Sequence, residues 1–270
     1  MSSTTEQNER HPDGQISTEV RGNIFLIGID RPEKYNGFTP KMFSELADAY
    51  AELENNSELW VGVLFAHGKH FTAGLDLPKF ADAMKKGEAI LPTNGIDPFS
   101  LKPPFRTKPV VAAMNGICYT AAIELMLATE IVVSARSARY SQLEVGRGVM
   151  AAAGATFRMV ERAGWGNAMK VLLTGYEFNA EEALRYNFIQ EIVDDGEEFN
   201  RALELAEEIA KQAPLAVQAT LQSSRAYYFD SPKAAVDEFI PVMQALANTE
   251  DAAEGVQSFI EKRPPVYKGK

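Results

Sequence analysis

Residues 108–135 read KPVVAAMNGICYTAAIELMLATEIVVSA, and the order of apolar and turn residues in this stretch decides the fold. Val110 to Met114 is a short apolar run typical of a buried strand, and Asn115-Gly116 ends it. Thr120 to Ala128 then reads as a helix of small, apolar residues. Together with the short apolar strands on either side, this order indicates buried, parallel pairing with crossover connections.

Glu124 is the one charged residue within this apolar helix, residues 120–128. Burying a carboxylate costs several kcal/mol unless it is partnered or protonated. Free N–H groups and the macrodipole at a helix start also stabilise negative charge. Glu124 is therefore a candidate for proton transfer, and the alternative is a partly exposed carboxylate that only favours the helix start.

Two flanking motifs extend the pattern. Residues 70–77 read HFTAGLDL after a predicted strand, and a glycine there lets a backbone N–H, which we assign to Leu75, face a ligand closely. In the same motif, Asp76 is interpreted as the N-cap of a helix over 77–84. Residues 141–144 read SQLE and add Glu144, a loop carboxylate just past a strand. Each motif alone has an ordinary structural explanation, but together they predict donors for an anionic oxygen and two carboxylates for proton transfer.

The rest of the chain divides into an α/β part and a helical part. We expect strands at residues 24–29 and 60–66, and a helix at 41–54 that Thr39-Pro40 begins. Residues 78–109 form a long irregular segment, either a substrate-covering lid or a mobile surface insert. One strand is expected at 188–193, and helices at residues 167–173, 180–186, 199–212, 214–229, 232–246 and 250–262.

Composition excludes several functional classes. The chain has 270 residues, 46 % of them apolar, and its net charge of −10 argues against generic nucleic-acid or anionic-membrane binding. One cysteine, Cys118, fits a reducing, cytoplasmic location and is interpreted as packing rather than as a nucleophile. The three histidines show no metal-ligand spacing. The polar start has no secretory-signal pattern, and residues 1–15 are expected to form a disordered tail.

Taken in order, these motifs resemble the crotonase (enoyl-CoA hydratase/isomerase) superfamily over residues 18–265, most closely its enoyl-CoA hydratases. The matching strings are RPEKYN (31–36), GKHFTAGLDL (68–77), the stretch quoted above, YSQLEVGRG (140–148), LLTG (172–175), AEEA (180–183) and FIEKR (259–263). The resemblance implies a spiral of β-β-α turns over residues 16–200. It also implies a helical region over 201–270 that builds trimers, usually paired into hexamers.

The resemblance also assigns roles to the motif residues. Leu75 and Ala121 would supply the two N–H groups that hold the thioester carbonyl oxygen of an acyl-CoA. Glu124 would position water and take its proton, and Glu144 would deliver a proton to Cα. The contacts implied for coenzyme A, which is part of the substrate rather than a separate cofactor, are Lys34, Ala73, Gly74, Asp76, Leu77 and, toward a neighbouring subunit, Phe259 and Lys262.

The implied activity is a lyase that adds water to a 2-enoyl-CoA, as in fatty acid metabolism. The alternatives are a double-bond isomerase, a dehydratase or a thioester hydrolase on the same fold, or a weakly catalytic acyl-CoA-binding homologue. Two departures bear on the substrate: Tyr119 to Ile123 replaces a glycine run, and Val149 to Ala155 replaces a Pro-Gly-rich stretch. Added methyl groups at these positions would change the shape of the pocket.

Overall fold

The structure is a computed structural model that describes residues 11–90, 92 and 94–270. Within these ranges every helix is too short or too polar to cross a lipid bilayer. Residues 1–10 of the predicted tail lie outside the described part. Residues 11–15 lie inside it, and there the Thr39 hydroxyl donates a hydrogen bond to Asp13 O at 2.8 Å.

Two sheets organise the core. The main sheet has the strand order β1-β2-β3-β4-β6-β9, with β1 antiparallel to β2 and every other pair parallel. The smaller sheet has the order β5-β7-β8. The strands are β1 (Gln15–Arg21), β2 (Ile24–Asp30), β3 (Val61–Ala66), β4 (Val110–Met114), β5 (Ile117–Tyr119), β6 (Ile131–Ala135), β7 (Arg139–Ser141), β8 (Phe178–Asn179) and β9 (Glu191–Val193).

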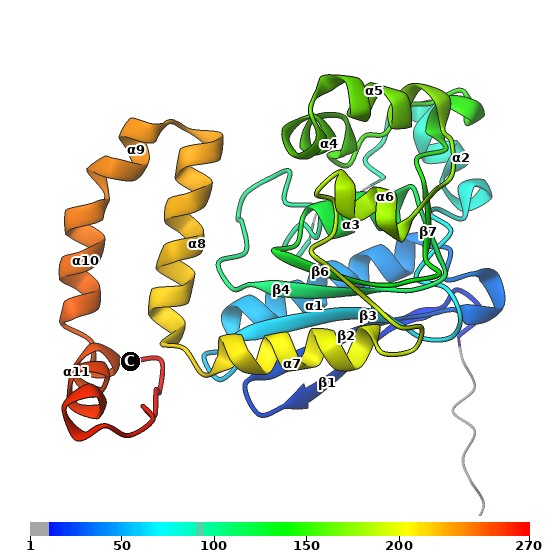
Figure 1. Cartoon of the computed structure of the whole chain (residues 1–270). Coiled ribbons are helices and arrows are strands. Elements are labelled where there is room, and N and C mark those ends of the chain that lie inside the picture. The colour runs from blue at the N-terminus through cyan, green and yellow to red at the C-terminus, as the bar shows by residue number, and fades with distance from the viewer. Residues whose placement is uncertain (1–10, 91, 93) are drawn as a thin grey trace, which may run out of the picture.

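Helices cover both faces of the main sheet. Figure 1 shows α1 (Pro40–Asn55) and α7 (Glu198–Ala210) on opposite faces. The side chains of β2 alternate between two apolar clusters, so Ile27 lies in one and Leu26 in the other. Both faces are therefore buried, which explains why the parallel strands read as uninterrupted apolar runs.

The remaining helices form the site and a separate arm. Those near the site are η1 (Pro32–Lys34), α2 (Leu77–Lys86), α3 (Ala121–Leu127), η2 (Glu144–Arg147), α4 (Ala155–Ala163), α5 (Trp165–Thr174) and α6 (Ala180–Arg185). The C-terminal arm consists of α8 (Pro214–Phe229), α9 (Pro232–Asp237), α10 (Phe239–Ala247) and α11 (Glu250–Glu261). In Figure 1 the arm stands beside the core, and α8 is its helix nearest the core.

Three differences from the sequence prediction have physical causes. The single helix predicted over 232–246 is two helices, because Pro241 has no N–H and its ring would clash with the carbonyl of Asp237. The segment 78–109 begins inside α2 and is irregular only beyond it. Strands β1, β5 and β8 were not foreseen, because such brief or half-exposed runs carry little periodicity, whereas β7 lies where a strand was expected just before Glu144.

A buried ionic cluster joins α8 to the core. The Arg106 guanidinium is completely buried and pairs with Glu130 Oε2 at 2.8 Å. Arg225, on α8, donates from Nη2 to Glu130 Oε1 at 2.9 Å. Glu130 thus pairs with one guanidinium from the core and one from the arm, so removing it would leave Arg106 without its carboxylate partner in a dry interior.

We expect Glu130→Ala to lower the free energy of unfolding by about 3–5 kcal/mol, the usual loss when one partner of a buried ion pair is deleted. Urea denaturation measures it. The control is Glu19→Ala, which breaks the exposed pair with Arg21 and should change stability by less than about 1 kcal/mol. Equal effects of the two substitutions would contradict a structural role for the cluster.

Candidate active site

Two segments are held side by side: residues 70–75, and residues 117–121, which comprise β5 and the start of α3. The Thr72 N–H donates to Ile117 O at 3.1 Å, and the Ile117 N–H donates to His70 Nδ1 at 3.1 Å. His70 therefore accepts through Nδ1, and this bond requires that nitrogen to be unprotonated. These bonds bring the loop after β3 and the loop before α3 together, although the two are more than forty residues apart in the chain.

Gly74 lies at the closest approach of these segments. Its φ of +100° belongs to a region that other residues rarely adopt. A Cβ added there would overlap Thr120 Oγ1 and lie 3.2 Å from Thr120 Cβ. Glycine is thus required at residue 74 for conformation and for space.

The backbone N–H groups of Leu75 and Ala121 are available to a ligand. The peptide groups on either side of Leu75 bond to the backbone of Phe38. The Phe38 N–H donates to Gly74 O at 2.8 Å, and the Asp76 N–H donates to Phe38 O at 2.9 Å. Neither the Leu75 nor the Ala121 N–H donates to another described residue. Both residues line one cavity of about 320 Å³.

Thr120 adopts a strained backbone conformation just before Ala121. Its φ of 52° and ψ of −108° are unusual for any residue with a Cβ, and more so for a β-branched one. The Thr120 N–H donates to Ser141 O at 2.9 Å, which helps to hold this conformation. Thr120 and Ala121 stand where the resemblance implies a glycine run, and the chain adopts the unusual turn without glycine.

Glu124 is a buried carboxylate on α3 with backbone partners. Only 5 % of the residue is exposed, and Oε1 accepts from the N–H groups of Ala153 at 2.7 Å and Ala155 at 3.3 Å. Burial raises its pKa from 4.5 to about 7 against the opposing effect of these donors, and the negative charge of Glu144 adds to the rise. Both protonation states of Glu124 are therefore accessible near neutral pH.

Glu144 is a second carboxylate on the same cavity. It is the first residue of η2, and its Oε1 accepts from Gln142 Nε2 at 2.9 Å. Its Oε2 is buried and has no hydrogen-bond partner among the described residues. Burial raises the pKa of Glu144 as well. An acceptor left unpaired at a cavity wall is available to a water molecule or a substrate.

The rest of the cavity wall is mostly apolar. Met84, Ile90 and Phe99 contribute to it, so the segment predicted as either a lid or a surface insert forms part of the wall. Phe99 is fixed there because its N–H donates to Asp97 Oδ1 at 2.9 Å. Residues 91 and 93 of this segment lie outside the described part of the chain.

The predicted coenzyme contacts divide into two groups. Ala73 and Leu77 line the cavity. Asp76 occupies the N-cap position of α2, as predicted, but its side chain makes no capping bond, because Oδ2 accepts from Arg31 Nη1 at 2.9 Å. Lys34 is exposed on η1 and does not line the cavity.

Phe259 and Lys262 belong to the arm. Phe259 is 85 % exposed on α11, and Lys262 ends that helix. In Figure 1, α11 lies at the end of the arm, on the side away from α2. These two residues do not line the cavity of their own chain.

Three site contacts were not foreseen from the sequence. They are the N–H donors of Ala153 and Ala155 to Glu124, and the amide of Gln142 beside Glu144. The turn that aims these donors needs Gly154, with φ of +113° and the Arg158 guanidinium directly against it. A glycine inside an alanine run was the available signal for that turn.

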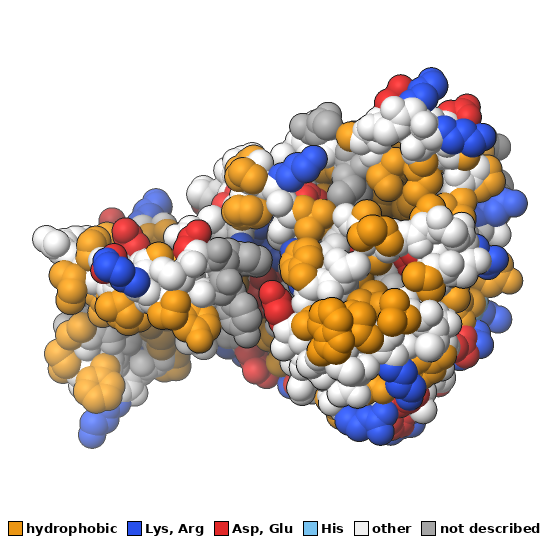
Figure 2. All heavy atoms as spheres, turned by 90° about the horizontal axis from the view of Figure 1, so that it is seen from above, with side chains coloured by type: hydrophobic (Ala, Val, Ile, Leu, Met, Phe, Trp, Pro, Cys, Tyr) orange, Lys and Arg blue, Asp and Glu red, His pale blue; other side chains and the backbone are white. Residues whose placement is uncertain are grey.

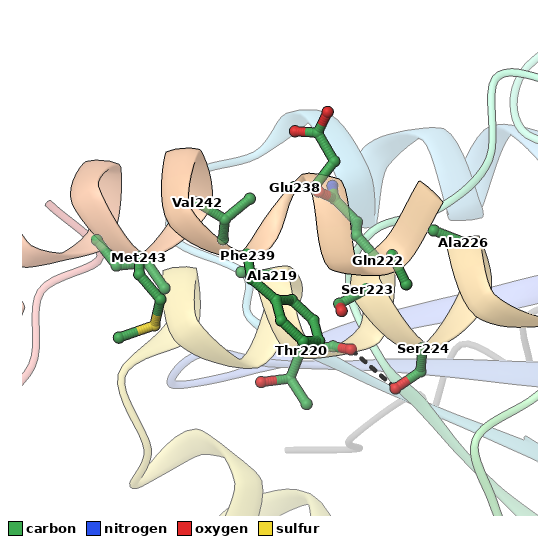
Figure 3. A pocket seen from close by; sticks show the side chains of 12 residues that line it. Ala219, Thr220, Gln222, Ser223, Ser224, Ala226, Glu238, Phe239, Val242 and Met243 are labelled. Carbon is green, nitrogen blue, oxygen red and sulfur yellow. Dashed lines mark hydrogen bonds between the residues drawn. The ribbon is translucent and has the colours of Figure 1, made fainter. Parts of the chain in front are cut away.

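A second cavity, of about 410 Å³, lies between α8 and the helices α9 and α10 (Figure 3). Two of its three hydroxyl groups are bonded within their own helix, since Ser224 donates to Thr220 O at 3.0 Å and Thr220 donates to Ala216 O at 2.8 Å. Glu238 is the one carboxylate on its described wall. This cavity therefore lacks the converging polar groups of a catalytic site, and the cavity beside Glu124 is the candidate.

Comparisons with known proteins find relatives that match nearly the whole chain. The family model described as enoyl-CoA hydratase/isomerase matches residues 19–270. The chain is 30 % identical to the (E)-benzylidenesuccinyl-CoA hydratase of Thauera aromatica, across 94 % of this chain and 99 % of the relative. It is 29 % identical to the 2,3-dehydroadipyl-CoA hydratase of Escherichia coli (strain K12), across 92 % and 96 %.

Solved structures show the same fold. The crystal structure of a probable enoyl-CoA hydratase/isomerase from Mycobacterium abscessus superposes with a TM-score of 0.92 at 38 % identity. The match covers 97 % of this chain and all of that one. The α/β spiral with C-terminal helices that the sequence predicts is confirmed.

The pKa of Glu124 predicts how stability depends on pH. The folded chain keeps this proton up to about pH 7, whereas an ordinary glutamate loses it near 4.5. Ionisation across that range therefore destabilises the folded state. We expect Glu124→Gln to be more stable than the parent chain at pH 8, by up to about 3 kcal/mol, with the difference vanishing below pH 4.5.

Urea denaturation at pH 4, 6 and 8 measures this difference. Glu52→Gln, at an exposed position on α1, is the control and should give curves that follow the parent chain at each pH. A Glu124→Gln protein no more stable than the parent at pH 8 would show that the carboxylate is not disfavoured in the fold.

The crowding at Gly74 gives a second prediction. Gly74→Ala should lower the free energy of unfolding by more than about 2 kcal/mol, because it adds backbone strain and a clash with Thr120. Gly87→Ala is the matched control, since Gly87 also has a positive φ, of +69°, but open space around it. Equal losses in urea denaturation would mean that the two loops are not in tight contact.

Proposed function

This chain belongs to the enoyl-CoA hydratase/isomerase family, and we propose that it adds water across the double bond of a 2-enoyl-CoA thioester. Two free N–H donors, the buried carboxylate of Glu124 and the partly buried carboxylate of Glu144 line one cavity, and that observation carries the proposal. The similar proteins named above are hydratases of acyl-CoA compounds, and crotonase-family acyl-CoA chemistry follows from membership. Hydration in particular is inferred from the carboxylate pair.

The N–H groups of Leu75 and Ala121 are suited to bind the thioester carbonyl oxygen. When water adds at Cβ, electrons move through the double bond onto this oxygen and form an enolate. Preorganised donors stabilise that charge at no reorganisation cost, and losing one such donor typically costs about 2.7–4 kcal/mol of transition-state stabilisation. The bonds that clamp residues 70–75 against 117–121 keep the two donors in place.

The two glutamates divide the proton transfers. Ionised Glu124 accepts a proton from water, whose oxygen bonds to Cβ, and protonated Glu144 gives a proton to Cα. The product is a 3-hydroxyacyl-CoA, and the site is left with the same total number of protons. A shared proton is favoured because burial raises the pKa of both groups and each disfavours a second charge.

The coenzyme A part of the substrate is assigned to residues at the edge of the cavity and on the arm. Backbone at Ala73 to Leu77 borders the cavity, and we place the pantetheine arm there, with Lys34 toward the nucleotide. Phe259 and Lys262 would reach the coenzyme of a neighbouring subunit, because they lie on the arm away from their own cavity. The substrate carries the coenzyme, so no separate cofactor is part of the proposal.

The arm also supports assembly into trimers or hexamers. Several large apolar side chains are exposed there, among them Ile240 at 77 % and Phe259 at 85 %. Figure 2 shows hydrophobic side chains gathered on the arm surface. Exposed apolar area on this scale is typical of protein interfaces.

The enzymatic test uses crotonyl-CoA and longer 2-enoyl-CoAs and follows the loss of enoyl absorbance. We expect hydration by the parent protein, and a fall in kcat of roughly 100-fold or more for Glu124→Gln and for Glu144→Gln. Glu52→Gln is the control. Release of free CoA would instead indicate a hydrolase, and movement of the double bond without hydration would indicate an isomerase.

Failure to hydrate any enoyl-CoA, with both glutamate variants indistinguishable from the parent on every thioester, would contradict the lyase proposal. Saturable acyl-CoA binding without turnover would identify an acyl-CoA-binding homologue instead.

Sedimentation equilibrium tests the assembly. We expect the parent protein to have the mass of a trimer or hexamer, and Ile240→Glu to shift it toward the monomer, since a charge would be buried in the interface. Val20→Glu, at a position 54 % exposed on β1, should leave the mass unchanged. A monomeric parent protein would contradict the assembly.

A further inference from the structure

Arg147 is a cation without a protein partner on the wall of the catalytic cavity. Among the described lining residues it is the only cationic side chain, and the only other charged ones are Glu124 and Glu144. It forms no ion pair or hydrogen bond with any described residue through its side chain. Arg158 nearby differs, because its guanidinium donates to Ser100 O at 3.1 Å and is thereby occupied.

The 3₁₀ helix η2 places Arg147 on the same side as Glu144. In a 3₁₀ helix, side chains three residues apart eclipse one another, and they are separated by about 6 Å along the axis. Glu144 is the first residue of η2 and Arg147 the last. The Gly148 N–H donates to Val145 O at 3.3 Å and the Val149 N–H to Glu144 O at 3.1 Å, so the turn that carries Arg147 is fixed.

Arg147 is itself exposed to solvent, and the residues that follow it on the cavity wall are apolar. Val149 and Met150 line the same part of the wall and are 43 % and 66 % exposed. Glu144 acts at Cα in the proposed reaction, and Arg147 lines the same cavity one turn beyond it, so we assign Arg147 to the acyl end of the substrate. The coenzyme arm, by contrast, is assigned to the other wall, at residues 73–77.

We propose that Arg147 binds a carboxylate on the acyl group, so that the preferred substrates are enoyl-CoA thioesters whose acyl chain ends in a carboxylate. This inference rests on the proposed function, because it assigns the substrate class of that same site. A guanidinium fits a carboxylate with two parallel hydrogen bonds. An alkyl chain in the same place would cover the cation without replacing its water, which disfavours simple fatty acyl chains.

A matched pair of substrates tests the proposal: 2-hexenoyl-CoA and its ω-carboxyl analogue, the 2-enoyl thioester of adipic acid. We expect the parent protein to have a kcat/KM roughly tenfold or more higher for the carboxylate, with the ratio falling as salt is added. Arg147→Gln should bring the ratio close to one, and Arg147→Lys should keep part of the preference. Arg136→Gln, at an arginine outside the cavity, is the control and should keep the parent ratio.

Two results would overturn the proposal. One is a parent protein with no preference for the carboxylate. The other is an Arg147→Gln protein that loses kcat/KM equally on both substrates and also binds free CoA more weakly, because Arg147 would then bind coenzyme phosphate. If neither substrate is hydrated, the proposed function fails, and the binding of hexanoyl-CoA and adipoyl-CoA to the parent and to Arg147→Gln still decides the role of Arg147.

Discussion

The contact between Gly74 and Thr120 is the constraint on which the site depends. Two chain segments from different strand ends approach so closely there that a single methyl group would not fit. The Thr72–Ile117 and Ile117–His70 hydrogen bonds hold them together and leave the N–H groups of Leu75 and Ala121 without protein acceptors. The buried parallel sheet beneath supplies a rigid base, since β3 and β4 are paired and lead into the two loops.

The site is built from groups that each cost stability. The backbone of Thr120 is strained, burial disfavours the ionised form of Glu124, and one carboxylate oxygen of Glu144 has no hydrogen-bond partner among the described residues. Such features persist only where the surrounding fold determines them. Here the N–H groups of Ala153 and Ala155 offset part of the burial of Glu124 and fix its position. The same features make the cavity reactive, because they leave N–H donors and carboxylates that can form hydrogen bonds with a substrate.

The sequence predicts the fold and four residues of the cavity wall, and three of these residues have a local marker. Leu75 follows a glycine after a strand, Ala121 begins a helix, and Glu124 is conspicuous on an apolar segment. Glu144 needed the family resemblance, since a loop glutamate is ordinary by itself. The N–H donors of Ala153 and Ala155 lie 29 and 31 residues from Glu124 in the chain, and no local sequence pattern encodes the backbone direction that aims them at its carboxylate. The roles of Lys34, Phe259 and Lys262 stay predictions, because they concern a bound coenzyme or a second subunit.

The central claim is that Leu75 and Ala121 together polarise the substrate carbonyl, and isotope-edited infrared spectroscopy tests it directly. The measured quantity is the carbonyl stretching frequency of crotonyl-CoA, labelled with ¹³C at the thioester carbon, free and bound to the Glu144→Gln protein. Two N–H donors on the oxygen weaken the C=O bond, so we expect a clear shift to lower frequency on binding. A bound frequency equal to or above that in water would contradict the assignment, because the carbonyl would then meet weaker donors than solvent.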